Sequence, residues 1–546
     1  MASILDDTTR FKKLGLVSTF DNTSAIESRI QRFLRKLLKA KSISRSVYGS
    51  IRPVGSQRPR LYGLPKLHKK DVPQRPILAM TNSAQHLISR WLVKVLEPVL
   101  LMYSSNCTSD SFSFSKTIRD LNVKGDTLLC SFDVKSLFTN VPVIETINIC
   151  ADALFDKGLN TTSLSRKDFV SLMQMMTCDV EFSFNDVVYK QIDGVAMGSP
   201  LGPTLANIFV GFYEEKLFST ICRPLLYVRY VDDTCVIFNN LDEKELFERK
   251  LNELHPRLQF TCEVEKDGSL PFLDVLIKKD KDAFLTSIYR KPTFSGSYTR
   301  WNSFCESGKK ISLIKTLTHR ALNICSPELL DEEIKEIAKI FLNNGYPETL
   351  VWSTIDAKMK HFRNPSAPVE GPPRCPVYIR LPYIGTLSQM YKKRITDAVR
   401  RCFYSVNLRV ILTSKPILQS AVKDVLPSMN RSNLVYLFSC CCESKYVGRT
   451  SQRLQSRIKQ HIPKNILKVL GTNKKPKSKP SSAIAQHLLK NISCGKQYQP
   501  SMFTIIGNGR SKFHLQVLEA LHIVGMDPLL CRQKEFVYSM LLFNKL

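Results

Sequence analysis

The chain has 546 residues, 43% of them hydrophobic, so it is long enough to bury the cores of two or more domains. It carries 79 lysines and arginines against 48 aspartates and glutamates, a formal net charge of +31, which suits a polyanionic partner. A membrane surface is the alternative binding partner. Because the basic residues are spread along the whole chain rather than collected on one amphipathic helix, nucleic acid is favoured.

The cysteines and the apolar segments bear on the cellular compartment. Most of the 16 cysteines stand singly in apolar runs, as Cys130, Cys235 and Cys262 do, which is typical of reduced core thiols. The first residues contain no apolar signal region. The most apolar stretch, 91–102, is interrupted by charges and a proline and is too short to span a bilayer. We therefore expect an intracellular protein, made in the cytoplasm and working in the nucleus, with no membrane partner.

The amino-terminal quarter of the chain predicts helices on either side of a proline-rich segment. Apolar residues at helical spacing predict an amphipathic helix over 25–40, whose other faces are basic. Those faces are either simply solvated or in contact with a nucleic-acid backbone. The prolines within 51–80 exclude a long helix there and predict short strands and loops. A second amphipathic helix is predicted over 83–101.

Two adjacent carboxylates interrupt an apolar run at 225–238, LLYVRYVDDTCVIF. The pattern predicts a β-hairpin with Asp232 and Asp233 at its turn. Taken alone, the acidic pair is more typical of a plain surface turn. The apolar flanks favour a buried hairpin, in which neighbouring carboxylates repel each other and need cations. Upstream, TLLCSFDV at 127–134 predicts a second buried strand that ends near Asp133.

Three carboxylates at strand ends can hold two divalent metal ions ~3.5–4 Å apart. Such a pair activates a 3′-hydroxyl and stabilises a leaving pyrophosphate, which is phosphoryl transfer of the polymerase type. The chain has no glycine-rich loop ending in GK[ST], so a P-loop nucleoside triphosphatase is not expected.

The segments around these strands predict further elements. A turn rich in glycine and proline precedes a helix predicted over 205–217. Residues 260–277 predict a strand pair with Pro271 at an edge or turn, and we assign no chemistry to Asp274 beside it. The basic segment 289–326 is expected to begin a helical region that follows a nucleic-acid backbone.

Three motifs carry a resemblance to a known family. They are SFDVKSLFTNVP (131–142), GVAMGSPLGPTLANIFV (194–210) and YVDD (230–233), which occur in the order of motifs A, B and C of a reverse transcriptase palm and resemble them. YGLPKLHK (62–69), LPFLDVLI (270–277), YRKPT (289–293) and LPYIG (381–385) are similar to signatures of Penelope-like retroelements. The resemblance covers roughly residues 50 to 540 and places the catalytic metals on the same three carboxylates.

The resemblance implies a mixed α/β (α+β), multidomain architecture: a right-hand polymerase followed by a small α/β nuclease domain. The expected divisions are an amino-terminal helical extension at 1–50, fingers at 51–125, palm at 126–288, helical thumb at 289–363, linker and small α/β segment at 364–430, and nuclease domain at 431–546. The best linker within these is NPSAPVEGPPRCP at 364–376.

The resemblance also implies substrate contacts in the polymerase. Lys66 and Arg75 are candidates to bind the incoming triphosphate, since cations offset its charge, although a generic basic surface is the alternative. Phe138 would crowd the sugar 2′ position and favour deoxynucleotides, and a core aromatic is the alternative. The remaining substrate-binding candidates are Gly198, Pro200, Gly202 and Tyr230.

The carboxyl-terminal part predicts a separate small domain. The segment 434–461 predicts two short strands, LVYLF and KYVG, followed by a helix, and 513–523 predicts another amphipathic helix. The basic run KKPKSK at 474–479 is a nuclear import signal, a DNA-backbone contact or a solvated loop.

Five side chains of this domain form a plausible nuclease site. A metal on Glu519 would stabilise the leaving group while a tyrosine helps to activate water. The arrangement resembles the GIY-YIG endonuclease family, with Tyr436 and Tyr446 in the two halves of the motif, read here as LVY and YVG. Arg457 and His461 fit later positions of that family's pattern, as does Glu519.

A zinc site is implied by the same resemblance, because endonuclease-bearing Penelope-like elements place a Cys/His zinc motif in this domain. Zinc prefers four nitrogen or sulfur ligands in a tetrahedron. The chosen ligands are Cys440, Cys442, His487 and Cys494, and Cys441 could replace either neighbour. Reduced cysteines without a metal are the alternative.

The sequence therefore predicts an RNA-directed DNA polymerase joined to a DNA endonuclease, encoded by a Penelope-like retroelement. The resemblance implies that the nuclease nicks chromosomal DNA and that the freed 3′-hydroxyl primes copying of element RNA. The expected partners are template RNA, primer and target DNA, and deoxynucleoside triphosphates. The expected cofactors are two Mg²⁺ ions in the polymerase, one in the nuclease, and zinc. Two alternatives stay open: a telomere-directed or DNA-templated polymerase, and a catalytically inactive nucleic-acid-binding derivative.

Overall fold

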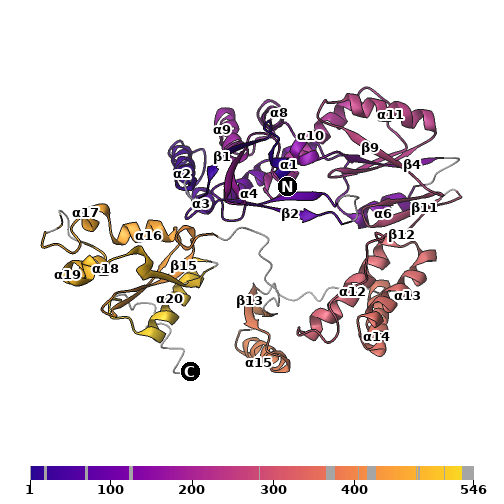
Figure 1. Cartoon of the computed structure of the whole chain (residues 1–546). Helices are drawn as coiled ribbons and strands as arrows, with labels where there is room; N and C mark the ends of the chain where they lie inside the picture. Colours follow the sequence, from indigo (N-terminus) through magenta and orange to yellow (C-terminus); the bar gives the residue numbers. More distant parts are fainter. Residues whose placement is uncertain are drawn as a thin grey trace.

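The computed structural model describes residues 2–17, 21–67, 72–121, 127–281, 283–364, 375–403, 405–414, 426–474, 476, 480–509 and 511–531. These residues form a mixed α/β, multidomain protein. Figure 1 shows a large body, a helical bundle below it on the right, a small unit of β13 and α15 in the middle, and the carboxyl-terminal domain on the left. None of the helices in these ranges combines the length and apolar character needed to cross a lipid bilayer.

A four-stranded antiparallel sheet forms the centre of the predicted palm, in the order β7-β8-β4-β9. Its strands are β4 (Leu128–Val134), β7 (Leu226–Tyr230), β8 (Asp233–Phe238) and β9 (Phe260–Val264). Side chains alternate between the two faces of such a sheet. Cys130, Phe132 and Val134 enter the largest core cluster on one face, whereas Leu129 and Cys235 enter a second cluster on the other.

Helices cover the first face of this sheet, and a second sheet covers the other. The first core cluster includes residues of α4 (His86–Val95), α5 (Glu97–Met102), α8 (Val143–Ala151), α9 (Arg166–Thr177), α10 (Leu201–Phe218) and α11 (Leu241–Glu253). The second includes α6 (Ser111–Arg119) and the three-stranded sheet β10 (Ser269–Phe272), β11 (Val275–Asp280) and β12 (Ala283–Ile288). Pro271 lies in β10, an edge strand, where its missing N–H is tolerated.

The expectation of a purely helical extension at 1–50 is wrong. Helix α2 (Thr23–Lys39) does form, and its apolar stripe is buried in the main core. However, β1 (Phe11–Leu16) follows α1 (Ala2–Leu5) and pairs with β6 (Val187–Gln191), far along the chain. Phe11 packs edge-on against Phe182, with ring centroids 6.0 Å apart. This long-range pairing, which local periodicity does not encode, turns the segment into a strand.

Strand β1 belongs to a five-stranded sheet in the order β1-β6-β5-β2-β3. The sheet combines β5 (Glu181–Phe184) and β6, from the range assigned to the palm, with β2 (Arg60–Pro65) and β3 (Gln74–Ala79), from the proline-rich segment. The short strands predicted at 51–80 are thereby confirmed. Helix α3 (Arg45–Ile51) precedes them, and α7 (Leu137–Asn140) and the π-helical turn Asp152–Asp156 lie beside the palm.

Three helices follow the palm and pack on one another: α12 (Ser307–Ile324), α13 (Pro327–Asn343) and α14 (Glu348–Arg363). Asp274 lies at their junction with the palm, where it pairs with Arg320 and accepts a hydrogen bond from Ser111. These contacts give that carboxylate a structural role. Most of the linker predicted at 364–376 lies outside the described residues, which resume at 375.

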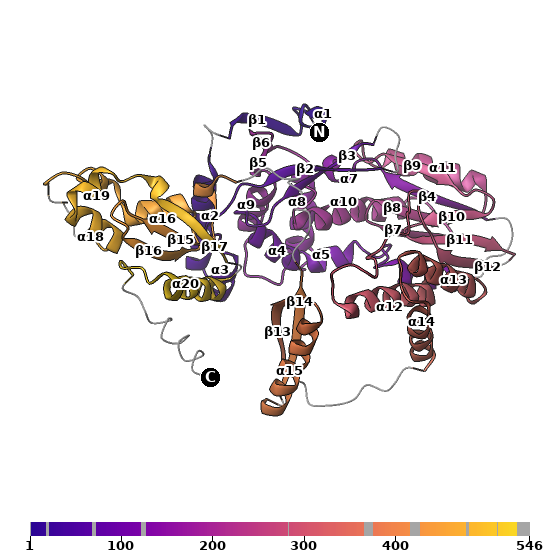
Figure 2. The same cartoon turned by 60° about the horizontal axis from the view of Figure 1, so that its bottom comes forward.

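The segment beyond the linker is a small βαβ unit, as its α/β pattern predicted. Its strands β13 (Cys375–Pro382) and β14 (Val406–Thr413) pair in parallel, and α15 (Thr386–Cys402) connects them. The unit projects from the body in Figures 1 and 2.

The carboxyl-terminal domain is a three-stranded sheet with helices on both sides. The predicted strands form as β15 (Leu434–Ser439) and β16 (Lys445–Thr450), and β17 (Phe503–Asn508) pairs on the other side of β15. The helices are α16 (Leu454–His461), α17 (Lys464–Leu467), α18 (Ala483–Lys490), α19 (Ile492–Lys496) and α20 (Lys512–Met526). Four residues of the basic run at 474–479 lie outside the described residues.

A polar joint connects this domain to the amino-terminal part of the chain. Asp21 lies between two nearly buried guanidinium groups, 3.2 Å from Arg58 Nη2 and 2.7 Å from Arg453 Nη1. Arg453 Nε also donates to the Ser56 carbonyl at 2.9 Å. Gly55, at φ +66°, lies so close to the Ser451 carbonyl that a Cβ would stand 2.1 Å from its oxygen. The joint therefore depends on one shared carboxylate and on one glycine.

Candidate functional site

The acidic hairpin predicted from the sequence is confirmed. Strands β7 and β8 pair from Tyr230–Asp233 onward, which leaves Val231 and Asp232 as a two-residue turn. Asp133 lies directly opposite Asp233 across β4 and β8, a position at which Cβ atoms are ~4.5–5.5 Å apart. The Asp232 carbonyl accepts a hydrogen bond of 3.1 Å from the Val134 amide. The backbone thus brings all three acidic residues to one end of the sheet.

A cleft of ≈ 360 Å³ opens beside these acids. Asp133 and Asp233 line it, together with Glu263, a fourth carboxylate that the sequence reasoning missed. Glu263 pairs with Ser131 on the neighbouring strand and so shares the face of Asp133. Tyr289 and residues of the two segments LPFLDVLI and YRKPT close the cleft; these residues are Pro271, Phe272, Leu273, Lys291 and Pro292.

The expectation that the acidic pair would be buried is wrong. Asp233 is exposed, and Asp232 and Asp133 are half-buried, although the strand residues after Asp233 are fully buried. The physical reason is that the hairpin ends at the rim of the cleft, so its tip stays in contact with water. Partly hydrated carboxylate oxygens at an open cleft are the donors that Mg²⁺ prefers, because that ion retains several of its waters.

A buried ion pair, which the sequence reasoning also missed, lies directly under the turn. Arg229 is 0% exposed and Glu214 is 1% exposed, and Arg229 Nε lies 2.6 Å from Glu214 Oε1. The Tyr227 hydroxyl donates to the same oxygen at 2.5 Å. Arg229 Nη1 donates to the Asn207 side chain at 2.7 Å and to the Val231 carbonyl at 3.1 Å.

The contact with Val231 matters because this β-branched residue has φ +57°, an uncommon conformation for its type. Such strain persists only where neighbours hold it, at a cost of ~1–3 kcal/mol. Arg229 is therefore positioned to hold the turn that carries Asp232. The available sequence signal was a lone arginine inside an otherwise apolar strand, which requires a buried counter-charge.

The glycines of the second motif allow close backbone approaches around Phe138. The Phe138 ring lies 3.6 Å from where a Cβ on Gly202 would stand. Gly198, at φ +111°, lies against β3, and a Cβ there would stand 2.2 Å from the Leu78 carbonyl oxygen. Leu78 in turn donates its amide to the Met197 carbonyl at 2.7 Å. The motif thus packs against the Phe138 ring through Gly202 and against strand β3 of the predicted fingers through Gly198.

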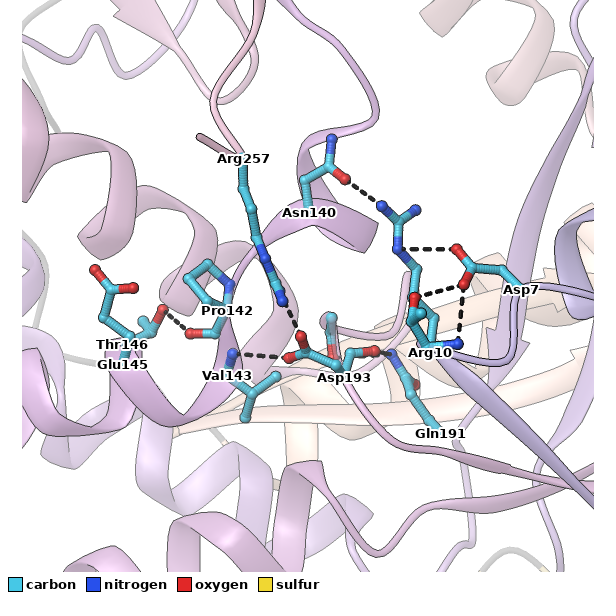
Figure 3. A network of polar contacts seen from close by, with 12 residues as sticks. Asp7, Arg10, Asn140, Pro142, Val143, Glu145, Thr146, Gln191, Asp193 and Arg257 are labelled. Carbon is cyan, nitrogen blue, oxygen red and sulfur yellow. Dashed lines mark hydrogen bonds and ion pairs between the residues drawn. The ribbon is translucent and has the colours of Figure 1, made fainter. Parts of the chain in front are cut away.

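A polar network, drawn in Figure 3, supports this motif from the side of the amino terminus. Asp193 pairs with Arg257 and accepts a hydrogen bond from the Val143 amide at 3.1 Å. Burial would raise the pKa of Asp193, but these partners outweigh it and hold that pKa below its ordinary value. Arg10 Nη2, just before β1, donates to Asn140 at 2.6 Å. The network ties the residue before β1 to α7, the short helix that contains Phe138.

The remaining polymerase candidates lie around this region. Arg75 is an exposed residue of β3 opposite Leu64, and Lys66 follows β2, with its amide donating to the Pro73 carbonyl at 2.9 Å. Pro200 caps the start of α10, and Tyr230 is 39% exposed beside the acidic turn. Their roles in binding substrate stay predictions.

The second predicted site, in the carboxyl-terminal domain, gathers around a buried tyrosine. The Tyr436 hydroxyl lies 2.6 Å from His461 Nε2, and Arg457 Nε donates to it at 3.2 Å. Tyr436 is fully buried, and burial raises its pKa. Burial, with the charge of Arg457, lowers the pKa of His461 to about 4, so this imidazole is neutral at physiological pH. Gly448 is required here, because a Cβ would stand 2.5 Å from the Tyr436 hydroxyl.

A cavity of ≈ 390 Å³ connects the other residues of this site. Tyr446, Arg457, His461 and Glu519 all line it. Burial raises the pKa of Glu519, although its ion pair with Arg449, 2.8 Å between Nε and Oε2, opposes that shift. The structure therefore places four of the five residues singled out in the sequence around one cavity, and the fifth, Tyr436, is hydrogen-bonded to two of them, His461 and Arg457.

The four residues chosen as zinc ligands also come together. The ligand atoms of Cys440, Cys442, His487 and Cys494 all lie within 4.8 Å of one another. His487 Nε2 is 3.3 Å from the sulfur of Cys440 and 3.3 Å from that of Cys442. Hydrogen bonding with Ser444 lowers the pKa of Cys442 to about 6, toward the thiolate that binds metals. Three sulfurs and one imidazole at this spacing fit tetrahedral Zn²⁺.

Comparisons with known proteins bear on the first site. The family model described as "Reverse transcriptase (RNA-dependent DNA polymerase)" matches residues 67–265, a range that holds all three acids of the hairpin and β4. A second model, "Animal helix-turn-helix domain", matches residues 297–356, which contain α12, α13 and part of α14. Telomerase reverse transcriptase of Mus musculus is 36% identical over 62 residues, 11% of this chain and 6% of that protein.

Solved structures with a similar course of the chain were also found. Telomerase from Candida albicans in complex with a TWJ fragment of telomeric RNA has 12% sequence identity and a TM-score of 0.40, over 59% of this chain and 60% of that one. The Sicinivirus 3Dpol RNA-dependent RNA polymerase has 12% identity and a TM-score of 0.35, over 58% of this chain and 71% of that one.

The family match and the acidic hairpin define the class of protein. The chain contains a reverse transcriptase domain, the domain of RNA-directed DNA polymerases. Domains of this class use divalent metals such as Mg²⁺, and the carboxylates at the cleft fit that requirement. Along a short segment, the chain is similar in sequence to mouse telomerase reverse transcriptase.

Proposed function

We propose that this chain is the protein of a Penelope-like retroelement and that it joins RNA-directed DNA synthesis to DNA nicking by a GIY-YIG nuclease domain. The nuclease cuts one strand of chromosomal DNA in the nucleus, and the freed 3′-hydroxyl primes copying of the element's RNA. The observation that carries the proposal is that one chain holds both a reverse transcriptase domain and a second cavity with Tyr446, Arg457, His461 and Glu519 in its wall.

In the polymerase, Asp133, Asp232 and Asp233 hold the metals. Two Mg²⁺ ions bound there would activate the primer 3′-hydroxyl and stabilise the leaving pyrophosphate. Lys66 and Arg75 offset the charge of the deoxynucleoside triphosphate. The Phe138 ring, held against Gly202, excludes a sugar that carries a 2′-hydroxyl.

In the nuclease, Glu519 would hold a single metal ion, which would supply stabilisation of the leaving group. Neutral His461 is hydrogen-bonded to the Tyr436 hydroxyl and orients it, and the guanidinium of Arg457 donates to the same oxygen. Tyr446 faces the cavity, where it can orient water and the phosphate. The Cys/His cluster lies at the end of β15 that is far from the polar joint. It would hold zinc and so fasten α18 and α19 to the strands.

One paired experiment tests both activities with the full chain. Asp232→Asn is expected to abolish extension of a DNA primer on an RNA template and to leave plasmid nicking intact. Glu519→Ala is expected to do the reverse. Undiminished extension by Asp232→Asn would show that the hairpin does not hold the catalytic metals. Undiminished nicking by Glu519→Ala would refute the proposed nuclease site.

A telomere-directed or DNA-templated polymerase is the second candidate, and the sequence shared with mouse telomerase reverse transcriptase is compatible with it. Extension of the same primer on matched RNA and DNA templates separates the two, since a retroelement polymerase favours RNA of arbitrary sequence. A telomere-directed enzyme would instead add a fixed repeat. An inactive nucleic-acid-binding derivative would extend neither template.

A further inference from the structure

We propose that the open face of the β13–β14 sheet is a binding platform for single-stranded RNA. This inference goes beyond the nuclease and rests only on RNA being the template of the reverse transcriptase domain. Helix α15 covers one face of the two strands: Leu408, Val410 and Leu412 form a small core with Ile395 and Val399.

The other face carries side chains suited to bases and phosphates. Tyr378 pairs with Arg409 in the parallel register, and Arg380 pairs with Ile411. Because side chains alternate along a strand, Tyr378, Arg380 and Arg409 project from the face opposite α15. Tyr378 is 62% exposed, and both arginines are exposed as well. Within the described part of the chain, these three side chains have no hydrogen-bond or ion-pair partner.

An exposed aromatic ring between two guanidinium groups is the chemistry of single-strand recognition. A base stacks on the ring whatever its identity, and the cations bind the phosphates on either side. The unit adds to this charge, because α15 contributes Lys393, Arg394, Arg400 and Arg401 and only one acid, Asp397. A protein partner would need an apolar core with few charges at its centre. The charge and the lone ring therefore favour RNA.

The position of the platform also suits RNA that enters or leaves the polymerase. Four contacts fasten the unit to the start of α12, the first helix after the palm. Lys392 Nζ lies 2.6 Å from Glu306 Oε1, and Lys309 Nζ donates to the Leu412 carbonyl at 2.6 Å. Gln389 donates to Ser307 at 3.1 Å, and the rings of Tyr383 and Phe304 are 5.0 Å apart. The platform is thus an extension of the helical bundle rather than a free segment (Figure 2).

The test uses the full chain and a labelled, unprimed oligouridine carrying 4-thiouridine, without Mg²⁺ or nucleotides, so that binding is read apart from polymerisation. The wild-type protein is expected to crosslink at Tyr378. Tyr378→Ala is expected to lose that crosslink and to weaken binding roughly 10-fold, while Tyr378→Phe retains both. Arg409→Gln is expected to weaken binding less and to reduce its dependence on salt.

The control is Tyr391→Ala, which removes a tyrosine that is 50% exposed and lies on α15 instead of on the open face of the sheet. It is expected to bind RNA as the wild type does. The proposal is overturned if Tyr378→Ala and Arg409→Gln bind like the wild type, or if Tyr391→Ala weakens binding as much as Tyr378→Ala. It is also overturned if the variants change only the binding of DNA of the same sequence, or only the oligomeric state. Failure of the primer-extension assay would leave these outcomes unaffected.

Discussion

Replacing Glu214 by glutamine is expected to destabilise the palm through the charge it leaves behind. Glu214 accepts two hydrogen bonds from Arg229, at 2.6 and 3.2 Å, and both side chains are almost fully buried. Hydrogen bonds to charged groups contribute ~1.5–3 kcal/mol each. An unpaired charge left in a protein interior costs ~3–5 kcal/mol. Against a domain stability of ~5–15 kcal/mol, the variant should fold but unfold at much lower urea concentration.

A double variant separates stability from the positioning of the turn. Glu214→Gln/Arg229→Met removes both charges and keeps an acceptor for Tyr227, so stability should return close to that of the wild type. It does not restore the donor to the Val231 carbonyl. Because the strained φ of Val231 costs ~1–3 kcal/mol, the turn should relax and primer extension should stay roughly 10-fold or more below the wild type.

The assay combines urea unfolding, hydrogen exchange of the β7–β8 amides and the rate of primer extension on RNA. The control is Arg166→Gln, which removes an exposed pair with Asp152 and should change stability by less than about 1 kcal/mol. If the double variant recovers both stability and extension rate, Arg229 does not position the acidic turn and the reasoning fails.

Three further predictions concern the other sites. Phe138→Ala should admit ribonucleotides, measured as their incorporation relative to deoxynucleotides, and an unchanged ratio would make the ring a simple core residue beside Gly202. His461 has a pKa near 4 in the folded protein instead of 6.5, so the unfolded state takes up the proton first as the pH falls. Unfolding of the carboxyl-terminal domain should therefore become easier between pH 6.5 and 4, by up to about 3 kcal/mol, and His461→Asn should lack this dependence in urea titrations. Cys494→Ser should lower both the zinc content measured by mass spectrometry and the melting temperature of the domain. Equal zinc content in the variant and the wild type would show that Cys494 is not a ligand.

The elements that the sequence predicts well are those encoded by local patterns. The hairpin around Asp232 and the strand that ends near Asp133 follow from apolar runs bounded by turn residues, and both are confirmed. Helix α2 follows from periodicity alone. The association of Tyr446, His461 and Glu519 needed the family resemblance as well, because no local pattern indicates that β16, α16 and α20 line one cavity.

The features that were missed depend on long-range pairing. Strand β1 forms because β6 offers an edge, and FKKLGL by itself does not alternate strongly enough to predict it. Glu214 is only one polar position in the helix predicted over 205–217 until Arg229 is placed against it. The exposure of Asp233 could not be read from its apolar neighbours, since the rim of the cleft is defined by β9, β10 and the YRKPT segment.

We expect the joint at Asp21 to have two states, closed and open. One carboxylate pairs with both Arg58 and Arg453, so its loss would leave two nearly buried cations that repel each other and push the parts apart. Partial loosening is thereby disfavoured: we expect the carboxyl-terminal domain to be either seated against the amino-terminal part or released as a whole.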